Sequence, residues 1–463
     1  MIATRLLPLI LIFATAATCL SVNAQASSAA TVQSLDRSAI ARYDRTLRAA
    51  SVLFGPAEAQ QSTAFLIDNG NDAAPALLVA SGHAVDERPD IVAEQLAGRG
   101  HVTFEGIDGA AFKVAHIRYT SQRGLDFAVF ELQQTQGALK ALGIVPMVLA
   151  GRRARAGDTV TVEARVSGVV NGSARWPTQD LARIDLKTGR GFLQRHLLLM
   201  EGALLQPGDS GSPVLEQATG AVLAVAHTRS PRGGEASDLS FLPACLNNGL
   251  FDVNAADCGL NHVFNVALDE DDDRMIYKAG SSTAQISQVL HSTTTLYQTK
   301  LAQWPDQCEQ ADGYGPVQVS GSPVNVPIEG LTLAPANPTV LALCVWGREA
   351  QGPEPANRNA LALPVVVHPK GPATQPELSI DPPYKDLKGR NAYLVTVEPE
   401  QVLFKRVELK SGPWNAIDCG DESGYRALAG LRKVAVTEDT RLCAVGVDYA
   451  GQRSQPLEMK LLP

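Results

Sequence analysis

The chain has 463 residues and a formal net charge of −8 at pH 7. This length exceeds that of one ordinary domain and predicts about two to four domains. The acidic balance and the scattered lysines and arginines argue against nucleic acid or an anionic membrane surface as the main partner.

Residues 1–24 have the pattern of a secretory signal peptide. One early charge, Arg5, precedes a largely apolar run over 6–20, and small residues end at Ala24. Lipid attachment at Cys19 is an alternative that its neighbours disfavour. No other stretch is apolar for long enough to span a bilayer. We therefore expect an exported protein, secreted or periplasmic, in which residues 25–50 form an N-terminal arm or propeptide.

Three later segments carry the residue types of nucleophilic catalysis. The apolar residues 76–80 predict a strand that ends just before His83, and Asp126 stands at the start of an alternating strand over 127–132. Ser210 lies in a Gly-Asp-Ser-Gly turn, where the amides of Gly208 and Ser210 can point at one spot and stabilise an oxyanion. Each segment alone has a structural explanation, because strand-end histidines, turn aspartates and such turns are common.

The order His83, Asp126, Ser210 resembles that of the trypsin/chymotrypsin family of serine peptidases, over roughly residues 50–280. The resemblance implies an all-β domain with a double antiparallel β-barrel. It also implies that His83 takes the proton of Ser210 while Asp126 holds the imidazole in the useful tautomer. The usual cysteine after the histidine is replaced by Ala84, so the histidine-loop disulfide of the family is absent.

The resemblance also places the substrate pocket. We expect it to involve Leu204, Leu205, His227 and Thr228. Leu204 stands where a preference for basic residues would require an acid. In glutamate-specific relatives a histidine near His227 contacts the acidic side chain, but those relatives carry a hydroxyl residue where this chain has Leu205. Apolar or small side chains are therefore the expected substrates, an acidic preference is the alternative, and a structural role for His227 is favoured over a ligand role.

The stretch 230–260 is longer than the loop expected there, and 261–266 resembles the next barrel strand of the family. On this alignment a disulfide-tied insertion overhangs the substrate pocket and influences specificity. In much of the family a freed N-terminus pairs with the acid before the nucleophile, here Asp209. The chain has no Ile-Val-Gly-Gly start to supply such an N-terminus.

Seven cysteines become six when Cys19 leaves with the signal peptide, and an even number in an exported chain predicts disulfides. Spacing favours neighbouring pairs: Cys245 with Cys258, Cys308 with Cys344, and Cys419 with Cys443. No cluster has the Cys/His spacing of a metal site, so neither a metal nor a cofactor is expected.

Beyond the acidic run 269–273, which we interpret as a linker rather than a calcium site, two segments look like internal repeats. In each, Gly-Tyr begins five residues after a first cysteine, and a Leu-Cys-x-x-Gly-x-acid pattern follows. Their alternating strands and single bridges resemble immunoglobulin-like or fibronectin-like β-sandwiches. The expected domains are a protease domain at 51–285 and sandwich modules at 286–370 and 371–463, which position the enzyme, bind a surface or polymer, or act as a spacer.

The sequence thus predicts a secreted serine endopeptidase that forms an acyl-enzyme on a protein or peptide substrate. The alternative is a catalytically inactive, protease-like adhesion or binding protein. A narrower alternative is an esterase-like or self-cleaving enzyme.

Overall fold

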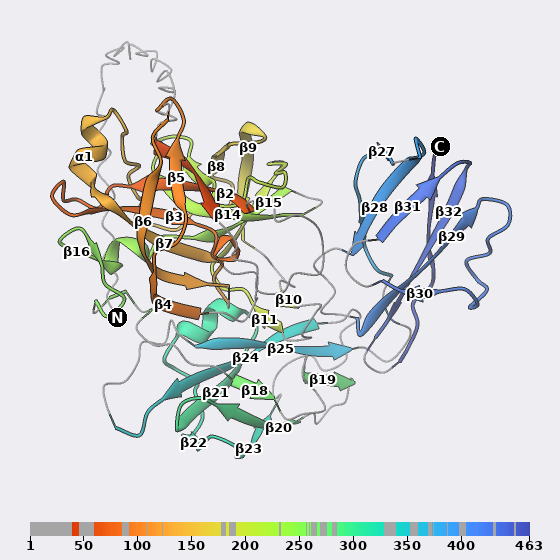
Figure 1. Ribbon diagram of the computed structural model, residues 1–463. Coiled ribbons are helices and arrows are strands. Elements are labelled where there is room, and N and C mark those ends of the chain that lie inside the picture. The colour runs from red at the N-terminus through yellow and green to blue at the C-terminus, as the bar shows by residue number, and fades with distance from the viewer. Residues whose placement is uncertain are drawn as a thin grey trace, which may run out of the picture. The chain divides into compact units, whose positions relative to one another are not determined.

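The computed structural model describes most of residues 39–463. The larger stretches outside the described residues are 1–38, 46–59, 86–91, 177–181, 185–190, 261–265, 269–275, 280–284, 328–338, 352–359 and 398–403. The expected signal peptide and the acidic run therefore lie outside the described residues, as does most of the N-terminal arm. Figure 1 shows that strands make up nearly all of the regular structure, which confirms the predicted all-β class.

Six antiparallel strands close the first barrel, in the order β6-β5-β1-β2-β3-β7 and back to β6. β4 pairs with β6 further along the edge that β5 occupies. The strands are β1 (Ile40–Arg45), β2 (Gln60–Ile67), β3 (Pro75–Ala80), β4 (Val92–Ala97), β5 (His101–Phe104), β6 (Phe112–Ser121) and β7 (Phe127–Thr135).

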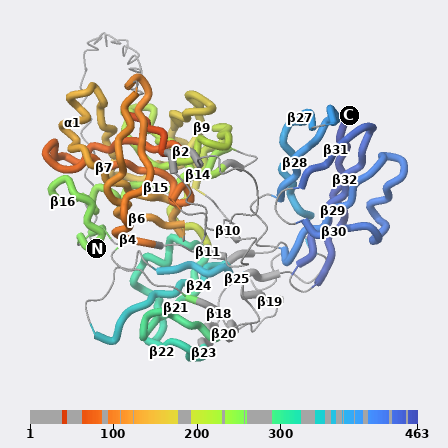
Figure 2. Tube along the Cα trace, viewed as in Figure 1, coloured from red at the N-terminus to blue at the C-terminus, as the bar shows by residue number. Residues whose placement is uncertain are grey.

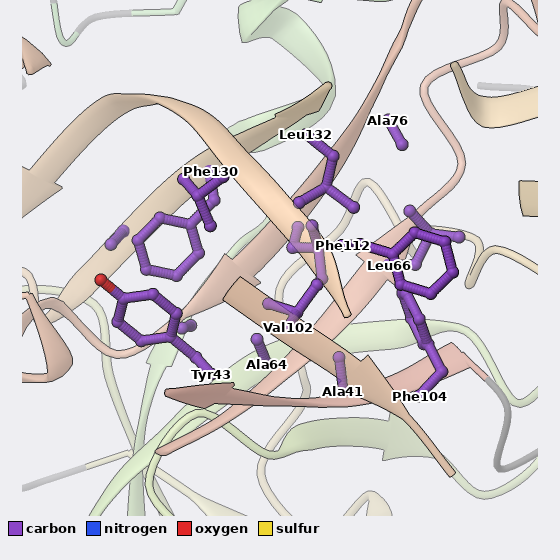
Figure 3. Packing of buried hydrophobic residues seen from close by; sticks show 14 of the residues in the cluster. Ala41, Tyr43, Ala64, Leu66, Ala76, Val102, Phe104, Phe112, Phe130 and Leu132 are labelled. Atoms are coloured by element: carbon purple, nitrogen blue, oxygen red, sulfur yellow. The ribbon is translucent and has the colours of Figure 1, made fainter. Parts of the chain in front are cut away.

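Large and small side chains alternate inside this barrel and fill it. Figure 3 shows Tyr43, Val102 and Phe130 beside the small residues Ala41 and Ala64. The rings of Tyr43 and Phe130 have their centroids 4.7 Å apart. The alternation along each strand that predicted half-buried strands therefore sends one face into a packed interior.

The second barrel is also closed by six strands, in the order β12-β15-β14-β13-β8-β9. These are β8 (Thr159–Ala164), β9 (Gly168–Arg175), β12 (Leu197–Glu201), β13 (Pro213–Glu216), β14 (Val222–Ser230) and β15 (Gly233–Asp238). Its core contains Val160, Leu198, Met200, Val214 and Leu223. The double antiparallel barrel that the sequence predicted is thus present.

One correction concerns the strand after β14. It is β15, and not the predicted segment 261–266, of which 261–265 lie outside the described residues and Val266 belongs to β18. The sequence of β15 does not show the alternating apolar pattern of a strand, because it begins with two glycines. Gly233 is required, because a Cβ there would lie 2.0 Å from the backbone atom Met200 O. Gly234 packs against the side chains of Met200 and Leu205.

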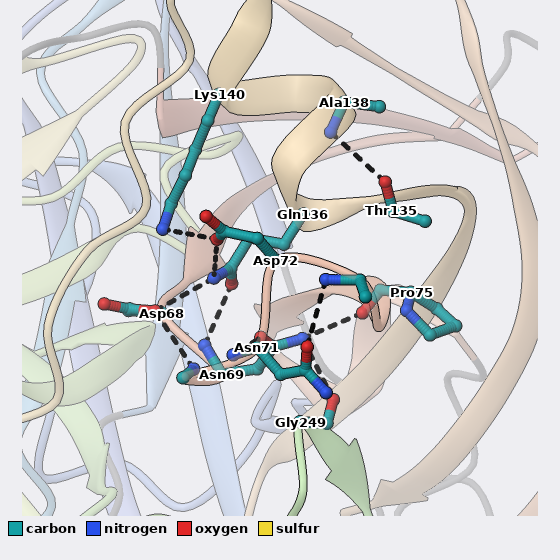
Figure 4. Close-up of polar contacts among 12 residues, drawn as sticks. Asp68, Asn69, Asn71, Asp72, Pro75, Thr135, Gln136, Ala138, Lys140 and Gly249 are labelled. Carbon is teal, nitrogen blue, oxygen red and sulfur yellow. Dashed lines mark hydrogen bonds and ion pairs between the residues drawn. The ribbon is translucent and has the colours of Figure 1, made fainter.

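A helix, α1 (Gln136–Ala141), follows the first barrel and is bonded to the turn between β2 and β3 (Figure 4). Gln136 Nε2 donates to Asp68 Oδ1 (3.0 Å) and Asp72 Oδ1 (3.2 Å), while its Oε1 accepts from Asn69 N (2.9 Å). Lys140 Nζ lies 2.6 Å from Asp72 Oδ1, and this hydrogen bond lowers the pKa of Asp72. This network holds the end of β3 that is opposite to His83.

A second correction concerns the segment tied by the bridge between Cys245 and Cys258. It contains η3 (Leu242–Cys245), β16 (Leu246–Asn247) and β17 (Leu250–Phe251). Its tip lies against the β2–β3 turn, where Asn69 Nδ2 donates to Gly249 O (2.9 Å). That turn and His83 stand at opposite ends of β3, about 20 Å apart for a strand of this length. The expectation that the bridged segment overhangs the substrate pocket is therefore wrong.

The strands from β18 to β33 form four further sheets, two in each of two modules, as the predicted sandwich class requires. Figure 2 traces the backbone of these strands. In the first module β18 (Val266–Leu268), β20 (Gln285–Ser292) and β23 (Pro323–Pro327) form one sheet. The other contains β19 (Ile276–Ala279), β21 (Leu296–Ala302), β22 (Gln318–Val319), β24 (Thr339–Arg348) and β25 (Leu361–His368). In the second module one sheet contains β26 (Leu378–Ile380), β27 (Tyr384–Lys385), β28 (Asn391–Val397) and β31 (Arg432–Val436), and the other contains β29 (Arg406–Pro413), β30 (Arg426–Ala427), β32 (Thr440–Val447) and β33 (Leu457–Leu461). The remaining elements are β10 (Ala182–Ile184), β11 (Gly191–Leu193) and η4 (Pro305–Glu309).

A buried lysine organises the cysteine loop of the first module. Lys300 stands opposite Cys344, which is bonded to Cys308. Its ammonium donates to Asp312 O (3.0 Å) and lies 4.6 Å from the ring centroid of Tyr314. The Tyr314 hydroxyl donates to Cys308 O (2.7 Å).

The second module repeats each of these contacts. Lys410 stands opposite Cys443, which is bonded to Cys419. The Lys410 ammonium donates to Ser423 O (3.0 Å) and lies 4.8 Å from the ring of Tyr425, whose hydroxyl donates to Cys419 O (2.9 Å). The two modules thus share one arrangement of cysteine bridge, tyrosine and lysine, and the lysine was not singled out in the sequence.

Candidate active site

A short 3-10 helix, η2 (Gly82–Ala84), places His83 just after the end of β3. Only glycine fits at its first position, because a Cβ on Gly82 would lie 1.8 Å from Ser121 O. The start of the helix therefore packs directly on the backbone of β6. This close approach fixes the position of the His83 backbone, from which the imidazole extends.

Asp126 holds His83 at two points. His83 Nδ1 lies 2.9 Å from Asp126 Oδ2, and His83 N donates to Asp126 Oδ1 (3.1 Å). The Asp126 side chain is fully buried, whereas that of His83 is 28 % exposed. Because a carboxylate accepts the Nδ1 proton, the neutral ring keeps Nε2 as its free acceptor. This is the tautomer that a general base requires.

The second barrel also contacts Asp126. Asp126 N donates to Ser237 Oγ on β15 (3.1 Å). Sequence analysis missed Ser237, since it lies in the inconspicuous strand that begins with two glycines. The hydrogen bond ties the orienting acid to both barrels.

The turn that carries Ser210 packs against β2 of the first barrel. Thr63 N and Ser62 Oγ both donate to Ser210 O, at 3.0 Å and 2.8 Å. Gly208 and Gly211 have φ angles of +98° and +90°, which residues other than glycine rarely adopt. A Cβ on Gly211 would in addition lie 1.8 Å from Thr63 O. The glycines therefore permit both the turn and its contact with β2.

Two amides of this turn remain available to a ligand. Neighbouring amides are engaged: Asp209 N donates to Gln206 O, Gly211 N to Ala226 O and Ser212 N to Asp209 O. Among the contacts of the described residues, the amides of Gly208 and Ser210 donate to no protein acceptor. They are the two amides that the sequence predicted as oxyanion donors.

His227 lies between the other site residues. Ser210 Oγ donates to His227 O (3.1 Å), and His227 Nδ1 lies 3.9 Å from Asp126 Oδ2. The described hydrogen bonds include none from Ser210 Oγ to His83, so proton transfer to His83 requires the Ser210 hydroxyl to turn away from His227 O. Catalytic hydrogen bonds are often long in unliganded enzymes and tighten with substrate.

The four predicted pocket residues differ in their exposure. Leu204 is 65 % exposed, but Leu205 is buried in the core of the second barrel. The side chain of His227 is fully buried beside Asp126, and Thr228 is half-buried opposite Glu235. This conformation therefore offers a substrate neither the Leu205 side chain nor the His227 ring. The position of His227 suits a structural role.

The crowding at Gly211 leads to a prediction. Gly211→Ala is expected to lower the free energy of unfolding by roughly 2–5 kcal/mol, because a left-handed alanine and an overlap with Thr63 O add their costs. Gly157→Ala is the matched control, since Gly157 has φ +89° but no atom within 4 Å of the place that a Cβ would occupy. It is expected to lose only about 1–2 kcal/mol. Urea denaturation measures both, and equal losses would contradict the close packing of the turn on β2.

Neither metal ligation nor a membrane span is found in the part of the chain that the structure describes. None of its helices has the length and apolar character that crossing a bilayer requires. No group of three or more histidine, cysteine, aspartate or glutamate side chains is placed to hold a metal ion there.

Comparisons with known proteins find no matching family model and no matching curated protein. Similar solved structures include a glutamic acid specific serine protease that utilizes a histidine triad in substrate binding (14 % identity, 38 % of this chain and 84 % of that chain, TM-score 0.26). Thermobifida fusca protease A is 15 % identical over 38 % of this chain and 82 % of its own, with TM-score 0.25. Fibronectin(III)-like modules of Clostridium thermocellum CbhA are 12 % identical over 43 % of this chain and 93 % of their own, with TM-score 0.16. Likenesses this weak carry no argument about activity.

Proposed function

We propose that the chain is an exported serine endopeptidase that hydrolyses peptide bonds through an acyl-enzyme on Ser210. The observation that carries the proposal is the two-point contact between His83 and the buried carboxylate of Asp126. A buried carboxylate that fixes the histidine tautomer also stabilises the imidazolium formed when that histidine accepts a proton. The three disulfides suit a chain that folds in an oxidising compartment.

The reaction would proceed in two halves. Ser210 Oγ attacks the scissile carbonyl while its proton passes to His83 Nε2, and the oxyanion is bound by the amides of Gly208 and Ser210. The imidazolium then gives its proton to the leaving amine, which departs and leaves an ester on Ser210. Water, deprotonated by His83, hydrolyses this ester and returns the proton to Ser210.

The substrate is proposed to be a protein or peptide with an apolar or small side chain before the scissile bond. Leu204 stands where an acid would be needed to attract a basic substrate side chain. The ring of His227 is buried beside Asp126 and is not exposed to an acidic substrate side chain. The C-terminal modules are proposed to position the enzyme or to bind a surface or polymer.

One observation favours the inactive, adhesion-type alternative. Ser210 Oγ donates its hydrogen bond to His227 O and not to the imidazole of His83. If this bond persisted with substrate present, the nucleophile would remain unactivated.

Incubating the purified, processed protein with a mixed peptide library and mapping the new termini by mass spectrometry separates the two functions. The proposal predicts cleavage with a common preference for apolar or small residues before the cut. Cleavage after acidic residues would revise the pocket, and an intact library would support the binding protein.

A further inference from the structure

The carboxylate of Asp209, the residue before the proposed nucleophile, is fully buried and accepts four hydrogen bonds. Gln206 N donates to Oδ2 (2.8 Å) from within the same turn. Val166 N (2.9 Å) and Ser167 N (3.2 Å) donate to Oδ1, and Ser167 Oγ donates to Oδ2. Three of the four donors therefore belong to the turn that joins β8 to β9.

The same turn also packs on the backbone beside Asp209. A Cβ on Gly208 would lie 3.0 Å from Val166 Cγ2. The side chain of Val166 thus lies over Gly208, while its amide is bonded to Asp209. Both residues that precede Ser210 are held by one neighbouring turn.

The contacts of the β8–β9 turn with Gly208 and Asp209 affect the proposed oxyanion donors, which are the amides of Gly208 and Ser210. The Gly208 and Ser210 amides lie on either side of Asp209, so a rotation of the Asp209 backbone changes the direction of one amide relative to the other. A buried carboxylate is held strongly by charge-assisted hydrogen bonds, since losing a donor leaves its charge desolvated and less compensated. The donors of the β8–β9 turn therefore limit how far the Asp209 backbone can rotate.

We propose that Ser167 is a positioning residue, which fixes the oxyanion amides through the Asp209 carboxylate. This inference rests on the proposed function, because it assigns a role within the same site. The donors to Asp209 among the described residues belong to its own turn and to the β8–β9 turn. These donors supply Asp209 with four hydrogen bonds, two to each carboxylate oxygen.

The test is the rate of labelling by a fluorescent fluorophosphonate, together with kcat and KM on a cleaved peptide, for Ser167→Ala, Ser167→Thr and Asp209→Asn. Ser173→Ala on β9 is the matched control, because that serine is exposed. Loss of the hydroxyl is expected to slow labelling and lower kcat about tenfold, with KM unchanged, since oxyanion donors act on the transition state. Threonine keeps the hydroxyl and is expected to restore the rate to within about twofold, whereas Asp209→Asn loses the charge and falls about 100-fold.

The outcomes distinguish the inference from the function on which it rests. Labelling of Ser167→Ala at the wild-type rate would overturn the positioning role and leave the peptidase intact. A loss accompanied by a lower melting temperature and a raised KM, without rescue by threonine, would also overturn it, in favour of a general structural role. No labelling of the wild-type protein would overturn the proposed function and this inference with it.

Discussion

Replacing Ser210 with alanine is expected to lower kcat for peptide hydrolysis by about 10⁶-fold, because the hydroxyl is the atom that forms the acyl-enzyme. The turn should remain folded, since its contacts with β2 are made by the Ser210 carbonyl and not by the hydroxyl. Steady-state kinetics on a cleaved peptide measure the loss, and an unchanged melting temperature shows that it is chemical.

The same motif provides the matched control. Ser212 is only two residues further on, but its side chain is fully buried. Ser212→Ala is therefore expected to keep kcat within a fewfold. The double variant Ser210→Ala, His83→Ala should be no slower than Ser210→Ala alone, because the two residues act as a unit. An active Ser210→Ala variant would contradict the assignment of the nucleophile.

Asp126→Asn is expected to lower kcat by about 10⁴-fold while leaving the fold intact. The amide of asparagine donates where the carboxylate accepted, so it selects the tautomer of His83 whose Nε2 carries the proton and cannot act as a base. The effect follows from the 2.9 Å contact between Asp126 Oδ2 and His83 Nδ1. The measurement is kcat against pH, with a thermal melt for each variant.

Asp158→Asn is the matched control for this substitution. Asp158 is a partly exposed acid in the turn before β8, bonded to Arg152 and to the Arg155 amide. Its change to asparagine is expected to leave kcat within about twofold, because surface ion pairs contribute little. If Asp126→Asn were as active as this control, the buried carboxylate would have no part in orienting His83.

The double barrel was predicted from a resemblance to the trypsin/chymotrypsin family, and that resemblance was visible because the segments that carry it are local. His83 follows an apolar strand, Asp126 precedes one, and Ser210 lies between glycines, so each is visible within ten residues. The structure places His83 and Asp126 in contact. Ser210 Oγ donates to His227 O, and the His227 ring lies beside Asp126. What joins these segments is tertiary, and no local pattern contains it.

The features that sequence analysis missed share this origin. β15 lacks an apolar alternation because Gly233 must fit against the backbone of Met200 and Gly234 packs against its side chain, so small residues replace the usual signal. The bridged loop was predicted to lie over the pocket because 261–266 was aligned with the strand after β14. A hydrogen bond from the Asn69 side chain, in a distant turn, instead holds the tip of this loop. Ser167 has no motif, and its role depends on a contact 42 residues further along the chain.

The central claim is that Ser210 is an activated nucleophile, and active-site labelling tests it most directly. The processed protein is treated with a fluorophosphonate, digested and mapped by mass spectrometry, beside His83→Ala and Ser210→Ala. The account predicts a single adduct on Ser210 that forms in the wild-type protein and is lost in both variants. An unmodified Ser210 in the folded wild-type protein, or equal labelling of the His83→Ala variant, would contradict it.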